Sequence, residues 1–363
     1  NSERIKPYLG GEEVNNHPRH LHHRYVIDFE DFPLRKDPAL YPWFRSSEKS
    51  QRQFLQNGIV PADYPWNVAS DWPSLLEVVE RLVKPERMKL GNDPDGKKRK
   101  AFWWHFGRRT PALDTLLSAV DNVLVLSRVT PQLAIGVSTA NCAFAESTVV
   151  LDRYIPSRLA MLQSRPHEIW ARFFSSSLED QLRYAPSDCF ATLPFPNGYE
   201  TSAELETTGQ AYYDHRAQLM IATKKGLTPT YNRFHDPYDE DPEIQRLRDL
   251  HADMDRAVLR AYGWDDLADA ANPVFLTEET ETEFTYQGRL FWPSGFRDEV
   301  LARLLDLNRA RHAAEANEGI AIATAPDAPH SAATDRIRAR QMDFGLDAGP
   351  LFDRTPTVDG NTE

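Results

Sequence analysis

The amino-acid sequence predicts an α+β protein, in which a domain with a mixed or antiparallel sheet precedes a mainly helical domain and a flexible tail. Short apolar or alternating runs typical of strands occur in the first 198 residues, and long runs with helical periodicity follow them. From about residue 317 the chain is rich in Ala, Pro, Asp and Thr and has few core-forming side chains. We therefore place the two domains at residues 1–198 and 199–316 and the tail at residues 317–363.

The strands of the first domain are predicted from alternation and from one continuous apolar run. Residues 123–126 (Val-Leu-Val-Leu) are typical of a strand that is buried on both faces. The other candidates alternate or are rich in β-branched residues, and they are residues 25–29, 133–137 and 148–151. Residues 1–24 are polar and turn-rich. Residues 30–70 hold prolines and aromatics without sustained periodicity, so we expect an irregular insertion there.

Helices are predicted where apolar residues recur every three or four positions. In the first domain these are residues 73–90, where Pro85 kinks or ends the helix, and residues 155–185, which end near Pro186. In the second domain, Leu205, Tyr212 and Leu219 indicate one long helix and residues 296–307 indicate another.

Residues 243–262 give the clearest helix of the chain. Asp241 is a suitable N-cap, Pro242 suits the first turn, and Gly263 is placed to end the helix. The apolar face is formed by Ile244, Leu247, Leu250, Met254, Ala257, Val258 and Ala261.

The charge of the chain is unevenly distributed. The formal net charge is −12, which is unfavourable for binding nucleic acid. Residues 201–363 carry most of the acidity, with 17 Lys and Arg against 30 Asp and Glu, whereas residues 1–110 hold 19 basic and 15 acidic side chains. The N-terminal half can therefore contact DNA even though the whole chain is acidic.

The composition and the N-terminal residues also indicate the cellular compartment of the protein. No apolar run approaches the roughly 20 residues of a membrane helix. The two cysteines, Cys142 and Cys189, form no CxxC pair, which argues against a zinc site or a disulfide framework and fits a reducing cytosol. Asn1 is not an initiator methionine and no signal segment follows it, so we expect a cytoplasmic chain that is entered mid-protein.

A run of cations is the best candidate for contact with DNA. Lys97, Lys98, Arg99 and Lys100 follow a Gly- and Asp-rich loop over residues 91–96, and Trp103, Trp104, Arg108 and Arg109 come next. Cations suit phosphates, and flat side chains pack against sugars or bases. A solvated surface loop is the alternative interpretation of the same residues.

Further candidates lie outside this run. Arg128, Gln132 and Asn141 come at the ends of predicted strands, and these residue types read guanine or adenine in the major groove. Arg24 closes a group of histidines and arginines over residues 17–24, which could be a DNA-backbone contact, a metal site or a solvated linker.

Two other patterns resemble metal sites but are incomplete. His167 and Glu168 open like the HExxH motif of zinc proteases, but Ala171 stands where the second histidine must be. Asp236, Asp239 and Asp241 lack the glycine and the terminal glutamate of a calcium loop. We predict no metal site from either pattern.

Several segments, taken together and in order, resemble the C-terminal half of large adenine-N6 DNA methyltransferases. The resemblance is to class I enzymes of fused type II restriction–modification systems and of BREX- or DISARM-like phage defence, and it covers most of residues 1–312. The most telling stretch runs from Ser164 to Phe174 and continues in Arg183-Tyr184 and residues 189–196. The further segments are residues 5–11, 22–29, 83–87, 103–104, 226–232, 247–255, 261–264 and 304–308.

In that family an upstream domain binds S-adenosylmethionine and methylates adenine, and the C-terminal half recognises the target sequence. This chain contains neither a glycine-rich loop for the methyl donor nor the Asn/Asp-Pro-Pro-aromatic tetrad, since Val274 follows Asn272-Pro273. The resemblance therefore implies no catalytic residue and no cofactor site in this chain, with S-adenosylmethionine bound by the missing catalytic domain. The partners it implies are double-stranded DNA, the upstream domain of the same parent protein and other defence-system subunits.

The leading hypothesis is thus a DNA target-recognition fragment that is not catalytic by itself. Residues 30–70 look longer and more irregular than in the family. Two alternatives remain, a metal-dependent nuclease that uses the histidine group and an acidic adaptor that binds other proteins through the second domain.

Overall fold

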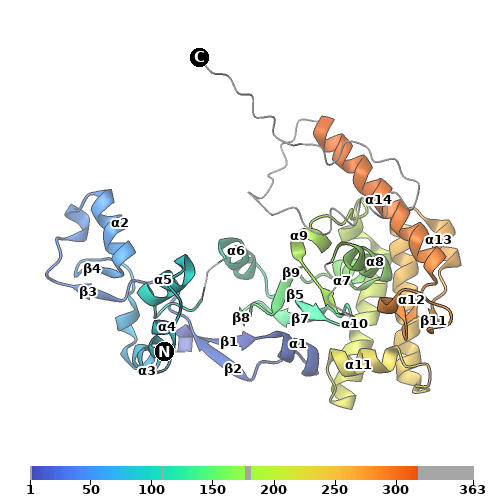
Figure 1. Cartoon of the computed structure of the whole chain (residues 1–363), viewed down its shortest axis with the longest axis horizontal. Coiled ribbons are helices and arrows are strands. Elements are labelled where there is room, and N and C mark those ends of the chain that lie inside the picture. Colours follow the sequence, from blue (N-terminus) through green and yellow to red (C-terminus); the bar gives the residue numbers. More distant parts are fainter. Residues whose placement is uncertain (1, 108–109, 176–180, 318–363) are drawn as a thin grey trace. The chain divides into compact units, whose positions relative to one another are not determined.

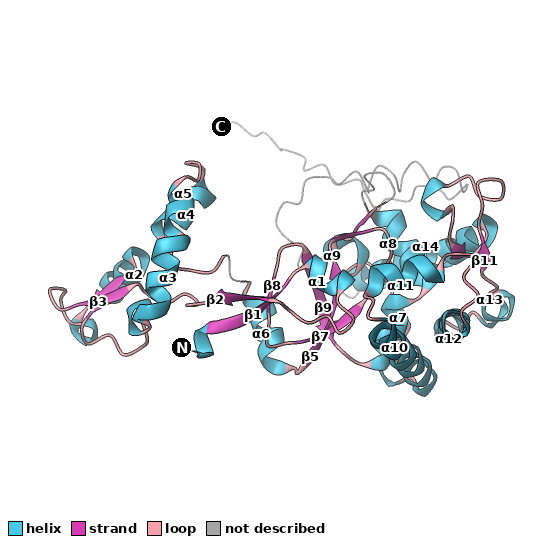
Figure 2. Cartoon of the chain, turned by 90° about the horizontal axis from the view of Figure 1, so that it is seen from below, coloured by secondary structure: helices cyan, strands magenta, loops and turns pink. Residues whose placement is uncertain are grey.

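A computed structural model describes residues 2–107, 110–175 and 181–317. They are mainly helical with short strands, which confirms the predicted α+β class (Figure 2). No helix in this part of the chain is long and apolar enough to cross a membrane. The predicted tail lies outside the described residues, apart from Asn317.

The chain forms two compact units that alternate along the sequence (Figure 1). Within the described residues, unit 1 comprises residues 2–107, 110–128, 134–155 and 213–233, and unit 2 comprises residues 129–133, 156–175, 181–212 and 234–317. A compact unit is not a functional domain, so the division at residue 198 stays a prediction.

The core of unit 1 contains an antiparallel three-stranded sheet in the order β7-β5-β9. Its central strand, β5 (Asn122–Ser127), is buried from Val123 onward, which confirms the strand predicted from the continuous apolar run. The outer strands are β7 (Gly136–Thr139) and β9 (Thr148–Arg153). The alternation predicted over residues 133–137 is wrong, because Leu133, Ala134 and Ile135 are all buried before the strand begins.

A second sheet of unit 1 has the order β2-β1-β8. Strand β1 (Ile5–Leu9) pairs antiparallel with β2 (Arg24–Ile27) and parallel with β8 (Ala143–Phe144). Helix α1 (Gly11–Asn16) follows β1 and begins where the Gly10 amide donates to the Glu13 carboxylate at 2.9 Å. The turn-rich segment over residues 1–24 therefore contains a strand and a helix that were not predicted, whereas the strand expected at residue 25 is confirmed with its start at Arg24.

Residues 35–68 form a small βαβ module rather than the irregular insertion that we expected. Strands β3 (Arg35–Asp37) and β4 (Ile59–Pro61) are parallel, and helix α2 (Glu48–Asn57) connects them. A core of Trp43, Val60, Tyr64 and Val68 holds the module together. Each strand has only three residues, so the sequence gives no periodicity from which to predict it.

Three helices follow this module in unit 1. The predicted helix over residues 73–90 is confirmed, although it breaks at Val83 into α3 (Pro73–Leu82) and α4 (Lys84–Met88), because Pro85 lies in the first turn of the second part. Helix α5 (Pro94–Ala101) occupies the segment that we predicted to be a loop, which corrects that prediction. Leu75 and Val79 of α3 pack in a core with Phe29, Ala69, Trp72, Trp103 and Trp104.

The remaining helices of unit 1 are α6 (Pro111–Ala119) and parts of two further helices. The predicted long helix is confirmed as α10 (Ala203–Thr223), whose residues from Tyr213 onward belong to unit 1, and α11 (Leu227–Phe234) follows it.

Unit 2 is mainly helical. The helix predicted over residues 155–185 is two helices that meet at Ser164, and a short strand precedes Pro186. The prediction is therefore right only in part. Residues 176–180 lie outside the described chain. The elements are β6 (Val129–Thr130), α7 (Pro156–Gln163), α8 (Arg165–Phe174), β10 (Leu182–Arg183), α9 (Pro186–Cys189), α12 (Pro242–Ala261), α13 (Asp265–Ala270), β11 (Val274–Phe275), β12 (Leu290–Phe291) and α14 (Ser294–Asn317).

Helix α12 has the features that its sequence predicted. The Asp241 carboxylate accepts a hydrogen bond from the Glu243 amide at 2.9 Å, and Gly263 follows the helix in the left-handed conformation with a φ of 78°. Most of the predicted apolar face is buried, and Leu304 and Val300 of α14 are also buried as expected.

Arg165 joins three elements of unit 2. Its side chain is 1% exposed and pairs with Asp255 of α12, while one guanidinium nitrogen donates to the Leu290 carbonyl of β12 at 2.9 Å. The Arg165 backbone amide also donates to Asp255, at 2.8 Å. The stretch from Ser164 to Phe174, which carries the family resemblance, therefore forms the centre of a packed unit.

Candidate nucleic-acid interface

Helix α5 presents the four cations that the sequence singled out. The Asp93 carboxylate accepts from the Gly96 amide at 3.1 Å, and Pro94 occupies the first turn. A side chain at Gly96 would lie 2.4 Å from the Gly91 carbonyl, so this turn requires glycine. Lys98, Arg99 and Lys100 fall in the last turn, where positive charge is favourable to the helix dipole.

Within the described residues, three of these four cations form no ion pair, and two of the three have no side-chain partner at all. Arg99 contacts the Asp95 carboxylate at 2.7 Å, and Lys100 donates to the Asn92 side chain at 3.1 Å. Lys97 and Lys98 are exposed and pair with no carboxylate in residues 2–107, 110–175 or 181–317. They are available to a partner that carries negative charge.

Trp103 and Trp104 follow this helix in the sequence and lie in a buried core of unit 1. They are 7% and 3% exposed, and the Trp104 indole donates to the Phe32 carbonyl at 2.8 Å. Lys84 lies over the Trp103 ring at 4.4 Å. The prediction that these rings offer flat faces to DNA is therefore wrong, because both are covered by protein and anchor the segment that follows α5.

Arg24 starts strand β2 and is bound to a buried carboxylate. Its Nε and Nη2 atoms donate to Glu13, each at 2.8 Å, and its guanidinium lies 5.1 Å from the centre of the Tyr8 ring. Burial alone would raise the pKa of Glu13, but the hydrogen bonds from Arg24 and backbone amides hold the pKa below its ordinary value. Arg24 thus has a structural partner, although its side chain remains 46% exposed.

The sheet register relates the positions of Arg24 and Asn141, which lie on or next to the two outer strands of the β2-β1-β8 sheet. Arg24 and Ala143 both pair with Tyr8, so they stand in one row, separated by about 10 Å, which is two strand spacings. Asn141 is exposed and lies two positions before Ala143. Arg128 follows β5, and its Nε donates to the Glu146 carbonyl at 2.8 Å.

Gln132 does not belong to this group. It lies in unit 2, and its side-chain oxygen accepts a hydrogen bond from Arg289. Arg108 and Arg109 lie outside the described residues. Of the sequence-predicted contact residues, Lys97, Lys98, Arg99, Lys100, Arg24, Arg128 and Asn141 are therefore the exposed or partly exposed members in unit 1.

The histidines of residues 17–24 are not gathered into a metal site. His17 accepts hydrogen bonds from the backbone amides of Arg19 and Leu21, whereas His20 is buried and contacts the Val14 carbonyl at 2.7 Å. Burial lowers the pKa of His20 to about 4, and the nearby Arg216 adds to this effect. The described residues contain no group of three His, Cys, Asp or Glu side chains that could hold a metal ion.

His167 and Glu168 also have structural partners. The His167 Nδ1 contacts the Leu162 carbonyl at 2.5 Å and its Nε2 lies 3.1 Å from the Tyr184 hydroxyl. Burial lowers the pKa of His167 to about 4, so the ring is neutral at physiological pH. Glu168 pairs with Arg172 at 2.7 Å.

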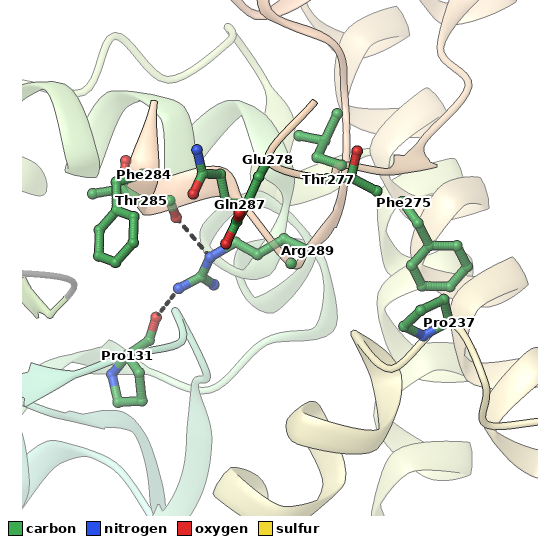
Figure 3. Close-up of a pocket in the computed structure, with 11 residues that line it drawn as sticks. Pro131, Pro237, Phe275, Thr277, Glu278, Phe284, Thr285, Gln287 and Arg289 are labelled. Carbon is green, nitrogen blue, oxygen red and sulfur yellow. Dashed lines mark hydrogen bonds between the residues drawn. The ribbon is translucent and has the colours of Figure 1, made fainter. Parts of the chain in front are cut away.

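Unit 2 contains a pocket of about 500 Å³ near β11 and β12 (Figure 3). Its walls include Phe275, Phe284 and Glu278, and one cation, Arg289, lines it. The guanidinium of Arg289 is held by the Thr285 carbonyl at 2.7 Å and the Pro131 carbonyl at 2.6 Å, as the dashed lines of Figure 3 show. With this arginine held by carbonyls and a carboxylate in the wall, the pocket is poorly suited to a phosphate.

Comparisons with known proteins give little guidance. No family model and no curated protein matches the chain. The chain is similar to a solved structure of MmeI, a Type IIL restriction–modification enzyme in complex with DNA, with a TM-score of 0.48 and 16% identity. This likeness covers 86% of the present chain and 31% of that chain. A likeness of this size carries no argument about function.

Proposed function

We propose that this chain binds double-stranded DNA and serves as the recognition part of a site-specific adenine-N6 DNA methyltransferase of a restriction–modification or phage-defence system. S-adenosylmethionine would be bound elsewhere, by a catalytic domain of the same parent protein. The ordered segments that resemble this family support the proposal, and the observation that carries it is helix α5 with its exposed, unpaired Lys97 and Lys98.

The segments that resemble the family contribute to the internal packing of unit 2 rather than to the proposed contacts with DNA. His167 and Trp170 of α8 contact Tyr184 and Thr192, which lie in two further segments of the resemblance. The ring of Trp170 is fully buried. These segments fix how unit 2 packs, so DNA contact has to be tested at other residues.

The cations of α5 give the direct test. Replacing Lys97, Lys98, Arg99 and Lys100 with Ala should weaken duplex binding by roughly 10- to 100-fold at low salt and reduce the slope of log affinity against log salt by about 2 to 4, since each lost phosphate contact removes about 0.9. Affinity is measured by fluorescence anisotropy at several salt concentrations.

A matched control removes two other exposed cations of unit 1, Lys224 and Lys225, by substitution with Ala. This variant should bind as the unchanged protein does. Equal binding by the α5 variant and the unchanged protein at every salt concentration would contradict the proposed interface.

Two activity assays separate this proposal from enzymatic alternatives. The purified chain should not methylate a duplex when it is supplied with S-adenosylmethionine, and it should not cleave a plasmid in Mg²⁺ or Mn²⁺. Methylated adenine in the first assay, or cleavage that EDTA abolishes in the second, would refute the assigned role.

A further inference from the structure

The βαβ module of residues 35–68 exposes three large aromatic side chains. Tyr41 is 62% exposed, Phe44 is 72% exposed and Trp66 is 59% exposed. Exposed apolar residues are common singly, but three large exposed rings on one small module are candidates for contact with a partner. We refer to Tyr41, Phe44 and Trp66 as the aromatic ridge.

Buried contacts hold the ridge in place. Trp43, beside Phe44, is 6% exposed; its amide donates to the Asp63 carboxylate at 2.7 Å, and its carbonyl accepts from the Gln51 side chain at 2.9 Å. The ring of Trp66 lies edge-on to Trp43, with their centres 6.0 Å apart. A ridge that is fixed before binding loses little conformational entropy when it meets a partner.

Positive charge accompanies the ridge. Arg45 follows Phe44 directly and Lys49 lies in the first turn of α2, and neither forms an ion pair with any carboxylate of the described chain. Arg52 contacts Glu48 at 3.6 Å, but both side chains are largely exposed. The module as a whole holds five basic and three acidic residues.

We propose that the aromatic ridge is a second DNA contact, in which its rings pack against bases and sugars while Arg45 and Lys49 bind the adjacent phosphates. Aromatic wedges and stacking platforms beside cations are typical of proteins that open or bend nucleic acid. The excess of five basic over three acidic residues in the module complements the phosphate charge, which favours DNA as the partner. This inference rests on the proposed DNA binding of unit 1 and adds a different kind of contact to it.

The test uses a duplex with 2-aminopurine, whose fluorescence rises when a base is unstacked. The unchanged protein should raise this signal, and Phe44→Ala and Trp66→Ala should each reduce it and weaken binding by about tenfold, since stacking contributes about 1–3 kcal/mol per base. Trp66→Phe should retain most of the signal. Tyr238→Ala, which removes an aromatic ring 88% exposed in unit 2, is the matched control.

The outcomes separate this inference from the proposed function. If the α5 variant weakens binding but the ridge variants leave binding and the 2-aminopurine signal unchanged, the ridge is not a DNA contact and the proposed function survives. If the ridge variants alter only self-association in light scattering, the ridge is a protein-binding surface and the inference is refuted. If no variant changes DNA binding, both proposals fail. Circular dichroism checks that each variant is folded.

Discussion

The cations of helix α5 and the interior arginines of unit 2 show two different uses of positive charge. Lys97 and Lys98 are exposed and have no carboxylate partner among the residues that the structure describes. Arg165, Arg289 and Arg297 are 1%, 7% and 3% exposed, and each is bound by carboxylates, carbonyls or both. Only the first group can respond to a ligand without dismantling the fold.

This contrast explains why counting charges is a poor guide to where DNA would bind. Unit 2 is rich in arginine, yet Arg297 is fixed to Glu281 at 2.6 Å and lies 3.9 Å from the centre of the Tyr286 ring. Burial alone would lower the pKa of Arg297, but the hydrogen bond to Glu281 and the charges of Tyr286, Glu281 and Glu283 together outweigh burial and raise the pKa. The cations of α5 differ from those of unit 2 in being exposed to a ligand, and not in how many there are.

The largest effect is expected where a buried arginine loses its partner. Asp255→Ala should lower the free energy of unfolding by about 3–5 kcal/mol, because Arg165 is left charged and unpaired in the interior of unit 2. Burial alone would raise the pKa of Asp255, but His251 and Arg165 hold the pKa below its ordinary value, so the carboxylate is ionised. Urea denaturation followed by circular dichroism measures the loss.

The control lies on the same helix. Asp253 forms an exposed pair with Arg256, and Asp253→Ala should cost less than about 1 kcal/mol. If both variants lose the same stability, the Arg165 contacts are not what holds unit 2 together, and the contrast between the two groups of cations is wrong.

A second effect depends on pH and on burial rather than on ion pairs. Because the pKa of His167 is lowered to about 4 from an ordinary value of 6.5, the unfolded chain binds a proton in this window while the folded chain does not. Stability is therefore lost as the pH falls from 6.5 towards 4, by about 1.4 kcal/mol per pH unit for each such histidine. His20 of unit 1 contributes in the same direction.

Substitution at His167 tests this assignment. His167→Gln should make the dependence of unfolding free energy on pH shallower between pH 6.5 and 4. Tyr184→Phe removes the hydroxyl that lies 3.1 Å from His167 but keeps the histidine, so it should lower stability without changing the slope. An unchanged slope in His167→Gln would show that this ring does not titrate as its burial implies.

The sequence predicts the elements whose signals are local. Helix α12 has its N-cap at Asp241, its apolar face and its terminating Gly263 within one continuous stretch, and strand β5 is one apolar run. Strand β1 and the βαβ module were not predicted, because they are short and are stabilised by pairing with distant segments, as when Tyr8 pairs with both Arg24 and Ala143.

The candidate site divides in the same way. The cations of α5 could be named from their run of four, but their helical form depends on the Asp93 cap and the close turn at Gly96. The burial of Trp103 and Trp104 depends on a core whose residues are spread from Phe29 to Trp104, so it could not be predicted from the neighbouring sequence. The run from Tyr41 to Arg45 was the signal for the aromatic ridge, but exposure is visible only in the fold.

The smallest expected effect is an increase in duplex affinity rather than a loss. Asp95 holds Arg99 in an exposed pair at 2.7 Å, so Asp95→Asn should release one more cation on α5. Stability should change by only a few tenths of a kcal/mol, up or down, because exposed pairs contribute little. Duplex affinity at low salt should rise by roughly twofold to tenfold, with the salt slope steeper by about one.

This gain in duplex affinity is a specific test of whether the α5 cations are available to DNA, because a loss of folding would lower affinity and not raise it. Glu48→Gln removes the partner of Arg52 in the βαβ module, and it tests whether releasing a cation beside the second proposed contact also raises duplex affinity. If Asp95→Asn leaves affinity and slope unchanged while the α5 alanine variant lowers both, Arg99 points away from the DNA and only Lys97, Lys98 and Lys100 remain as contacts. If Asp95→Asn lowers affinity, the pair with Arg99 is needed to hold α5 in its binding form, and its cations are less free than their exposure indicates.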